Sequence, residues 1–277
     1  MRGLDAPAGC YRPPMDATAL ARLEHANMVG AMSLIASNVD GAMVRQTDDV
    51  AVLSSGLPFV LFNQVLVAGD AATPGAIVAG VGVMRDRGSP FVVNLRVGTD
   101  DAFAVVAREL GLVPLSEHPW MPGMAMHPVS GESPVDVPGF EIRQASDGAG
   151  IEDHIKAAAV GFDMADDLIR AIVVLTLLDR ADVAVYAGYV DGEPVATGLG
   201  FRTGQTIGVY NIATTPSFRG RGYGAAMTGR VVADGVAAGC DVAVLQSSDM
   251  GFSIYERLGF RTVVEYMGYV EPSATDR

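Results

Sequence analysis

The stretch I-G-V-Y-N-I-A-T-T-P-S-F-R-G-R-G-Y-G, residues 207–224, decides the fold. Residues 207–214 are apolar and rich in β-branched and aromatic side chains, which is typical of a strand. From Tyr223 to Ala238, apolar residues recur at helical spacing. A glycine-rich turn that opens a helix leaves backbone N–H groups unpaired, and the helix dipole adds about half a positive charge there. The sequence therefore predicts a cradle for a pyrophosphate, assisted by Arg219 and Arg221.

Two common phosphate-binding motifs do not fit this turn. A Walker A loop ends in Gly-Lys-Ser/Thr, and no such tripeptide follows the glycines. The spacing Gly220-x-Gly222-x-Gly224 lacks the wider final interval of the dinucleotide fingerprint. No early βαβ unit with an acidic ribose ligand precedes it either, which argues against a Rossmann-type nucleotide enzyme.

The pattern Arg219-x-x-Gly222-x-Gly224 after a strand resembles the acetyl-CoA loop of the GNAT N-acetyltransferase superfamily. Further along the chain, S-I-Y-E-R-L-G-F (residues 253–260) resembles the second signature of that superfamily, a helix that ends in Leu-Gly-Phe. The resemblance implies an α/β chain with a mixed (α+β) sheet and a GNAT acyl-CoA N-acyltransferase fold in the C-terminal half. It also implies the order β-α-α-β-β-β-α-β-α-β, which residues 140–271 follow.

The resemblance assigns most of the expected site residues to the binding of acetyl-CoA, the acyl donor. The residues expected to bind it are Ile212, Ala213 and Thr214 for the pantetheine arm, Arg219, Gly220, Arg221, Gly222, Tyr223, Gly224 and Ala225 for the pyrophosphate, and Ser248. One N–H of the first group is expected to bind the developing oxyanion. Tyr255 stands where many members of the superfamily protonate the departing thiolate, and a tyrosine of pKa ~10 carries its proton at neutral pH.

The general base is not evident from the sequence. Many members carry a glutamate on the strand before the loop, and Tyr210 stands at that position here. His154 and Asp163 fall in the region of the acceptor site, but we expect both to be surface residues and not bases. Without a strong base, a weakly basic amine is the easier acceptor. An amine of pKa ~10.4 is neutral in about one molecule in a thousand at pH 7, whereas an α-amine of pKa ~7.8 is neutral in about a tenth.

Residues 128–139 have linker composition and divide the chain into a domain at 1–127 and an N-acetyltransferase (GNAT) domain at 140–277. In the first half, Arg108-Glu109-Leu110-Gly111-Leu112 echoes residues 256–260, which suggests a degenerate GNAT-like domain. Ala107 stands at the position of Tyr255, and no acetyl-CoA loop occurs. We therefore expect this half to be structural or to shape the acceptor site.

Other features of the N-terminal half are less specific. The elements expected there are a helix at 19–35, strands at 41–46, 50–54, 59–67 and 91–97, an apolar run at 76–84, and a helix that begins near Thr99–Asp101 and ends at Leu110. His118, Trp120 and His127 fit no zinc pattern, so we expect them to pack in the core of this half.

Composition excludes several classes of function. The net charge of −13 argues against nucleic acid as a partner, because contacts with phosphates supply most of that affinity. No stretch reaches the ~18 apolar residues of a membrane span, and the N-terminus lacks a signal-peptide core. Cys10 and Cys240 form no redox or metal spacing, which favours a cytoplasmic location and no metal site.

These observations favour an acetyl-CoA-dependent N-acetyltransferase that uses direct attack of a primary amine on the thioester. The acceptor would be a small molecule or a peptide, and a homodimer stays open. The alternative is a non-catalytic acyl-CoA-binding sensor or regulatory module. Tyr255 favours the enzyme, whereas Tyr210 in place of an acidic residue keeps the alternative open.

Overall fold

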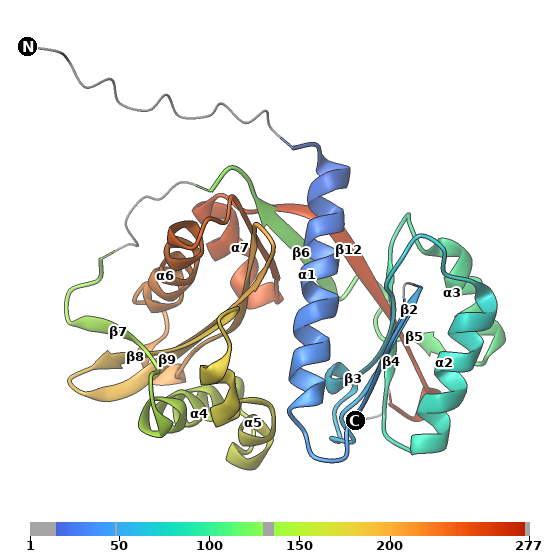
Figure 1. The fold of residues 1–277 in the computed structure, drawn as a ribbon, viewed down its shortest axis with the longest axis horizontal. Coiled ribbons are helices and arrows are strands. Elements are labelled where there is room, and N and C mark those ends of the chain that lie inside the picture. Colours follow the sequence, from blue (N-terminus) through green and yellow to red (C-terminus); the bar gives the residue numbers. More distant parts are fainter. Residues whose placement is uncertain (1–14, 48, 130–135, 275–277) are drawn as a thin grey trace, which may run out of the picture.

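One mixed β-sheet runs through both halves of the chain in this computed structural model, which describes residues 15–47, 49–129 and 136–274 (Figure 1). Its strands are β1 (Met43–Gln46), β2 (Val50–Ser54), β3 (Asn63–Val67), β4 (Val92–Arg96), β5 (Val113–Pro114), β6 (Met121–Met126), β7 (Phe140–Gln144), β8 (Val183–Val190), β9 (Glu193–Thr203), β10 (Thr206–Thr214), β11 (Val242–Gln246) and β12 (Arg261–Val270).

Helices cover this sheet in both halves. The α-helices are α1 (Ala17–Ser37), α2 (Pro74–Arg87), α3 (Asp101–Glu109), α4 (Gly148–Phe162), α5 (Asp166–Ile172), α6 (Tyr223–Ala237) and α7 (Asp249–Leu258), and the 3-10 turns are η1 (Val60–Phe62), η2 (Leu175–Asp179), η3 (Pro216–Phe218) and η4 (Pro272–Ala274). The mixed α/β class predicted from the sequence is confirmed. No helix among the described residues is both long and apolar enough to cross a bilayer.

The two halves repeat one order of elements and exchange their last strands. The sheet order is β1-β2-β3-β4-β12-β6-β11-β10-β9-β8-β7, and β5 pairs with β12. The parallel pairs are β3 with β4 and β10 with β11, and each is connected by a helix, α2 or α6. β6, from the N-terminal half, pairs with β11, whereas β12, from the C-terminal half, pairs with β4. The halves are therefore hydrogen-bonded into one sheet, and the domain boundary at 128–139 remains a proposal.

The echo between the two halves has a structural basis. α3 and α7 both end at a glycine in the left-handed conformation, Gly111 at φ 82° and Gly259 at φ 103°. In each case the following residue donates a backbone hydrogen bond of 3.0 Å to the carbonyl five residues earlier, Leu112 to Ala107 and Phe260 to Tyr255. This is the Schellman pattern of a helix end, which glycine forms most readily because it has no Cβ. The same local chemistry thus leads into β5 in the N-terminal half and into β12 in the C-terminal half.

Helix α1 lies between the two lobes of the molecule (Figure 1). Asp16 caps its N-terminus by accepting from the N–H of Ala19 at 2.7 Å. Ala31 belongs to the core of α4, α5 and the C-terminal strands, whereas Met28 and Val29 belong to a core with Leu53 and Leu66. Because one helix contributes to both cores, it fixes the position of each lobe relative to the other.

The structure refines the expectations for residues 76–84 and 165–178. The apolar run at 76–84 is the middle of helix α2, whose glycines obscured the pattern; Gly80 allows close approach to β3, since a Cβ there would lie 3.0 Å from Val65. In the order expected for residues 140–271, the second of the two consecutive helices corresponds to residues 165–178; this segment breaks at Val173 and Val174, which are extended before η2. Their β-branched side chains favour extended backbone, and Val173 is buried against the sheet.

The bounds and the partners of β6 were not predicted, and the strand expected at 59–67 is shorter than predicted. Residues 60–62 form the η1 turn, so β3 begins at Asn63. His118, Trp120 and His127 were expected to pack in the core, and the segment between the two histidines contains β6, which pairs with strands on both sides. His118 is exposed, so its predicted core position is wrong. Pro119, Pro122 and Gly123 weaken the alternation that identifies a strand, and the pairing partners lie far away in the sequence.

We expect Gly123→Ala to destabilise the joined sheet. A Cβ at Gly123 would lie 2.5 Å from both Glu24 Cδ and Val264 Cγ1, so β6 or its neighbours must shift. Overpacking of this kind costs about 1–3 kcal/mol, which urea unfolding measures. Gly82→Ala is the matched control, because Gly82 lies in helix α2 with nothing within 4 Å of its Cβ position. That change should be neutral or stabilise by up to about 1 kcal/mol. Equal stabilities of the two variants would contradict the close approach at β6.

Candidate active site

The two parallel strands of the C-terminal half diverge where the candidate site begins. β10 pairs with β11 from Thr206 to Gly208. Further along β10, its register against β9 shifts between Tyr210 and Ala213, and Asn211 takes φ 54°. A bulge leaves a residue unpaired and bends the strand. Ile212, which is expected to contact the pantetheine arm, therefore lies at this bulge, beside the place where β10 and β11 diverge.

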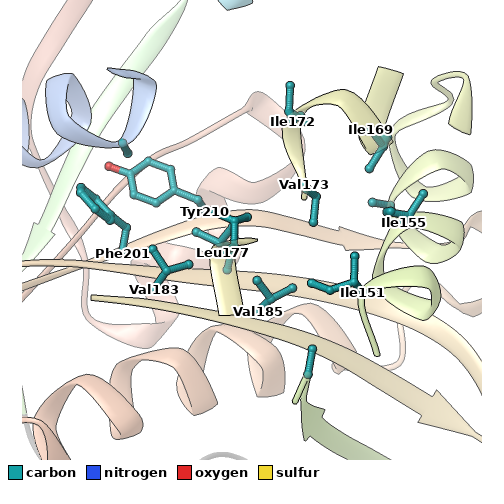
Figure 2. Close-up of a cluster of buried hydrophobic side chains, with 14 of the residues drawn as sticks. Ile151, Ile155, Ile169, Ile172, Val173, Leu177, Val183, Val185, Phe201 and Tyr210 are labelled. Atoms are coloured by element: carbon teal, nitrogen blue, oxygen red, sulfur yellow. The ribbon is translucent and has the colours of Figure 1, made fainter. Parts of the chain in front are cut away.

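Tyr210 is held by the N-terminal half. Its hydroxyl donates to Asn27 Oδ1 on α1 at 2.7 Å, and Figure 2 shows it pointing towards that helix. Burial, followed by the nearby carboxyl of Glu24, raises the pKa of Tyr210 well above its ordinary value. The hydroxyl thus keeps its proton and already has a partner. Tyr210 joins the two halves and has no character of a base.

His154 is completely buried, so its expected surface position is wrong. Its Nδ1 lies 2.8 Å from the carbonyl oxygen of Tyr186, and its Nε2 lies 2.6 Å from Nδ2 of Asn211. A neutral ring with the proton on Nδ1 satisfies both contacts, because it donates to the carbonyl and accepts from the amide. Burial lowers the pKa of His154 to about 4, which keeps the ring neutral. His154 therefore orients Asn211. Asp163 is exposed, as predicted, and ends α4.

Tyr255 projects from α7 beside the opening and is half-buried. Burial raises its pKa to about 12, so the hydroxyl stays protonated. Its ring meets Phe260 edge-to-face at 6.0 Å between centroids. Gly251 gives the ring its space, since a Cβ at this position would lie 2.7 Å from Tyr255 Cε2. Ser248 is exposed at the start of α7, lines the same opening, and does not cap the helix with its side chain.

The glycine-rich turn presents unpaired backbone donors at the start of α6. Gly220 and Gly222 take φ 76° and 88°, and Gly222 occupies the N-cap position without a side-chain cap. The first helical hydrogen bond is that from Ala226 N–H to the Gly222 carbonyl at 3.0 Å. The N–H groups from Gly220 to Ala225 have no acceptor within the described residues. Consecutive free N–H groups at a helix start form an anion site.

The two arginines of the turn fasten it. Arg219 donates from Nε to the Thr214 carbonyl at 3.1 Å and from Nη2 to the Gly161 carbonyl at 2.8 Å. Arg221 donates to the Ser217 carbonyl at 3.2 Å and stacks 5.0 Å from the centre of the Phe218 ring. Both guanidiniums thus bind the protein and contribute positive charge near the free N–H groups.

The other residues expected to bind acetyl-CoA differ in whether their backbone or their side chain is accessible. Tyr223 is buried and stacks on Phe140 at 4.3 Å between ring centroids, so only its backbone faces the turn. Gly224 and Ala225 are half-buried in the first turn of α6. Ala213 and Thr214 are paired with β9, opposite Thr197 and Ala196.

The equivalent helix of the N-terminal half begins differently. Thr73 caps α2, because its Oγ1 accepts from the N–H of Ala76 at 3.2 Å. Pro74 at the first helical position has no N–H. Of the first three donors of α2, the first is therefore missing at Pro74 and the third is satisfied at Ala76. This agrees with the absence of an acetyl-CoA loop from this half of the sequence.

A cavity of about 390 Å³ lies beside the bulge and extends between the two halves. α1 lines one side with Met28, Ala31, Met32, Leu34, Ile35 and Asn38. The other side comes from β10, β11 and the α5–η2 segment, whose buried side chains appear in Figure 2. Tyr255, Ser248 and Ile212 line it too. The bulge, the tyrosine and a contribution from the N-terminal half thus meet at one site.

Glu24 is a buried carboxyl behind this cavity that sequence reasoning missed. It is 0% exposed; Oε1 accepts from Gln246 Nε2 at 2.5 Å, and Oε2 lies 2.7 Å from the hydroxyl of Tyr266. That hydroxyl lies 3.0 Å from Nδ1 of His25. Burial raises the pKa of Glu24 to about 7 and lowers that of His25 to about 4. The sequence carried one signal for this buried group, because Glu24 and His25 stand within the apolar repeat of α1.

Comparison with known proteins agrees with this geometry. Residues 144–251 match the family model of the acetyltransferase (GNAT) domain. The structure is similar to a GCN5-related N-acetyltransferase from Kribbella flavida, with a TM-score of 0.67, 18% identity, and coverage of 90% of this chain and 95% of that one. It is also similar to one from Sphaerobacter thermophilus, with a TM-score of 0.60, 16% identity and coverage of 94% of both chains.

A third similar structure is a tandem GNAT protein from the clavulanic acid biosynthesis pathway, with a TM-score of 0.60 and 10% identity. The alignment covers 92% of this chain and 95% of that one. At these identities the likeness shows the fold, and it extends over the N-terminal half.

His154 makes a specific contribution to the pH dependence of stability. Its pKa falls from 6.5 to about 4 on folding, so the unfolded chain binds more protons between these values. Stability is therefore lost as the pH falls through this window, by up to about 3 kcal/mol. In His154→Gln this loss should disappear, whereas the titration of His25 and Glu24 is common to both proteins. Urea unfolding at pH 7 and pH 4.5 measures the difference, and parallel losses in the two proteins would contradict a neutral buried ring.

Proposed function

We propose that this protein is an acetyl-CoA-dependent N-acetyltransferase, because residues 144–251 match the family model of the acetyltransferase (GNAT) domain. The observation that carries the proposal is the meeting of the β10 bulge, Tyr255 and the cavity at the place where β10 and β11 diverge. Bound acetyl-CoA would supply an activated acetyl group as a thioester. The residues of this chain would hold the donor, receive the amine and keep a proton next to the leaving sulfur.

The turn at residues 219–225 fits the pyrophosphate of the donor. Its N–H groups from Gly220 to Ala225 lack acceptors within the described residues, and no side chain caps α6. Free donors at a helix start stabilise a bound anion, and the two fastened guanidiniums add to the positive potential. Ile212, at the bulge, is the proposed donor to the carbonyl oxygen on which negative charge develops. One such preorganised donor is worth about 3–4 kcal/mol in the transition state.

Tyr255 is the proposed acid. Its hydroxyl keeps its proton at neutral pH because burial raises its pKa to about 12. In the reaction the amine lone pair forms the new C–N bond, and the C–S electron pair leaves with sulfur. Tyr255 donates to that sulfur, and the proton lost by the amine nitrogen restores the tyrosine. The products are an N-acetylated amine and free thiol, so atoms and protons balance.

The alternative of a non-catalytic sensor is not favoured. A sensor requires the cradle alone, whereas this chain also keeps Tyr255 and clears space for its ring with Gly251. The missing glutamate at Tyr210 removes one way to deprotonate an ammonium ion, but it does not prevent the reaction of an amine that is already neutral.

Gly222→Ala tests the cradle. At φ 88° an alanine is strained, and relaxation would turn its N–H groups away from the anion. We expect the affinity for CoA to fall about tenfold or more, which isothermal titration calorimetry measures. Gly204→Ala is the matched control, because Gly204 has φ 57° in the turn before β10 with open space around it. It should unfold more easily and bind CoA normally. Equal CoA affinity of both variants would refute the cradle.

Tyr255→Phe tests the acid. Loss of a general acid lowers turnover by about a hundredfold or more. The phenyl ring keeps the packing against Phe260, so the affinity for CoA should stay within about twofold. Thiol release over a panel of amines gives the turnover, and calorimetry gives the affinity. Turnover at the level of the parent protein would remove Tyr255 from the mechanism.

A further inference from the structure

The cavity between the two halves offers no charge to a ligand. Its lining residues are all described, and none of them is an aspartate, glutamate, lysine, arginine or histidine. The residues around it are mainly aliphatic and aromatic, from α1, η1, β10 and the α5–η2 segment. Taking an unpaired ammonium ion from water into such a space costs several kcal/mol. A cationic amine would therefore have to lose its proton before it enters.

Large apolar side chains also form the rim of the cavity. Phe59 and Leu61 from the N-terminal half are 43% and 38% exposed, and Phe162 from the C-terminal half is 40% exposed. Three large hydrophobic residues gathered at one mouth form an exposed apolar surface, which is typical of a ligand-binding groove. The volume of about 390 Å³ lies within the range for small-molecule sites.

Two uncharged amide side chains near the bulge are oriented by buried partners. Asn211 uses its Nδ2 on His154, which leaves its side-chain oxygen without a partner among the described residues. Gln246 likewise uses its Nε2 on Glu24. An uncharged amide oxygen can accept from the N–H of a neutral amine, but it cannot compensate for burying a full positive charge.

From these observations we propose that the acceptor is an apolar small molecule whose amine is already neutral at pH 7, such as an amine attached to an aromatic ring. Its apolar body fills the cavity between α1 and β10, and its nitrogen lies by Asn211 and the bulge. The reaction of this acceptor rests on the proposed acetyl transfer. Its binding does not, because binding can be measured without an acetyl donor.

The test uses the fluorescence of Trp120, which is the only tryptophan of the chain and lines the cavity. Two isomers with the same carbon content differ in basicity: 4-butylaniline is neutral at pH 7, whereas 4-phenylbutylamine is an ammonium ion. Titration of the full-length protein without CoA should give binding at least about tenfold tighter for the aniline. Loss of one proton at a pKa near ~10.4 sets an upper limit near a thousandfold.

The pH gives a second readout. Between pH 7 and pH 9 the affinity for 4-phenylbutylamine, relative to that for the aniline, should rise about tenfold per pH unit. The reason is that the neutral fraction of 4-phenylbutylamine rises by the same factor. The titratable groups around the cavity are Tyr210 and Tyr255 in its wall, Glu24 behind Gln246, and His154 behind Asn211. Of these groups Glu24, with a pKa of about 7, titrates in the range used, and its charge would favour the cation; its ionisation is largely complete above pH 8, so the ratio of the two affinities between pH 8 and pH 9 isolates the ligand.

Variants on α1 and at the rim locate the binding. Ala31→Phe fills the cavity and should weaken aniline binding at least about tenfold, whereas Ala26→Phe on the exposed face of the same helix should not. Leu61→Asp places a carboxylate at the exposed rim and keeps the test valid if Ala31→Phe does not fold. It should shift the ratio of affinities about tenfold towards the cation.

Three outcomes would overturn the proposal: equal binding of the two isomers at pH 7, tighter binding of the cation, or a Trp120 response to decanoyl-CoA with none to either amine. The last result would assign the cavity to a long acyl chain. Thiol release from acetyl-CoA is measured separately. If the aniline binds but no amine causes thiol release, the acetyl transfer is rejected and the cavity assignment is kept. If only cationic amines cause thiol release, the acetyl transfer is kept and the cavity assignment is rejected.

Discussion

The last strand of each half is hydrogen-bonded into the sheet of the other half, and the site depends on this exchange. β6 lies between β11 and β12, and β12 continues into the N-terminal half through β4. Glu24 on α1 reaches both exchanged segments, because it contacts Tyr266 on β12 and lies against Gly123 on β6. α1 is thus held over the opening beside β10. If the halves separated, the cavity would lose one of its walls, and the hydroxyl of Tyr210 would lose Asn27.

The two halves have the same order of elements and different chemistry. Each has a parallel pair of strands joined by a helix, followed by a helix that ends at a left-handed glycine. In the C-terminal half the joining helix starts with free N–H groups at Gly222, and the next helix carries Tyr255. In the N-terminal half Thr73 and Pro74 close the helix start, and Ala107 is completely buried at the position of the tyrosine. One half therefore supports the proposed chemistry, and the other supplies walls.

Sequence features of neighbouring residues were enough to predict the strand, the turn and the helix that position the candidate site. β10 and the start of α6 follow directly from residues 207–224, because a strand, a glycine turn and a helix are set by neighbouring residues. Non-local facts could not be predicted. β6 is defined by partners that lie more than a hundred residues away in β11 and β12. His154 looks like a surface residue in sequence, and its burial depends on β8 and the bulge at Asn211. Glu24 was overlooked because a charged residue in an amphipathic helix is ordinarily exposed.

Neutrality is a common property of the buried polar groups around the cavity. His154 is neutral because its pKa lies near 4, and Tyr210 and Tyr255 keep their protons because burial raises their pKa values. The ionised form of Glu24 accepts from the Tyr266 hydroxyl at 2.7 Å. Below its pKa of about 7 the protonated carboxyl can instead donate to that oxygen, whose hydroxyl then donates to His25 while that ring donates to the Val67 carbonyl, and this protonated form carries no net charge. A site made of neutral groups and backbone dipoles cannot remove the proton from the ammonium ion of a strongly basic amine. The acceptor amine must therefore already be neutral when it binds.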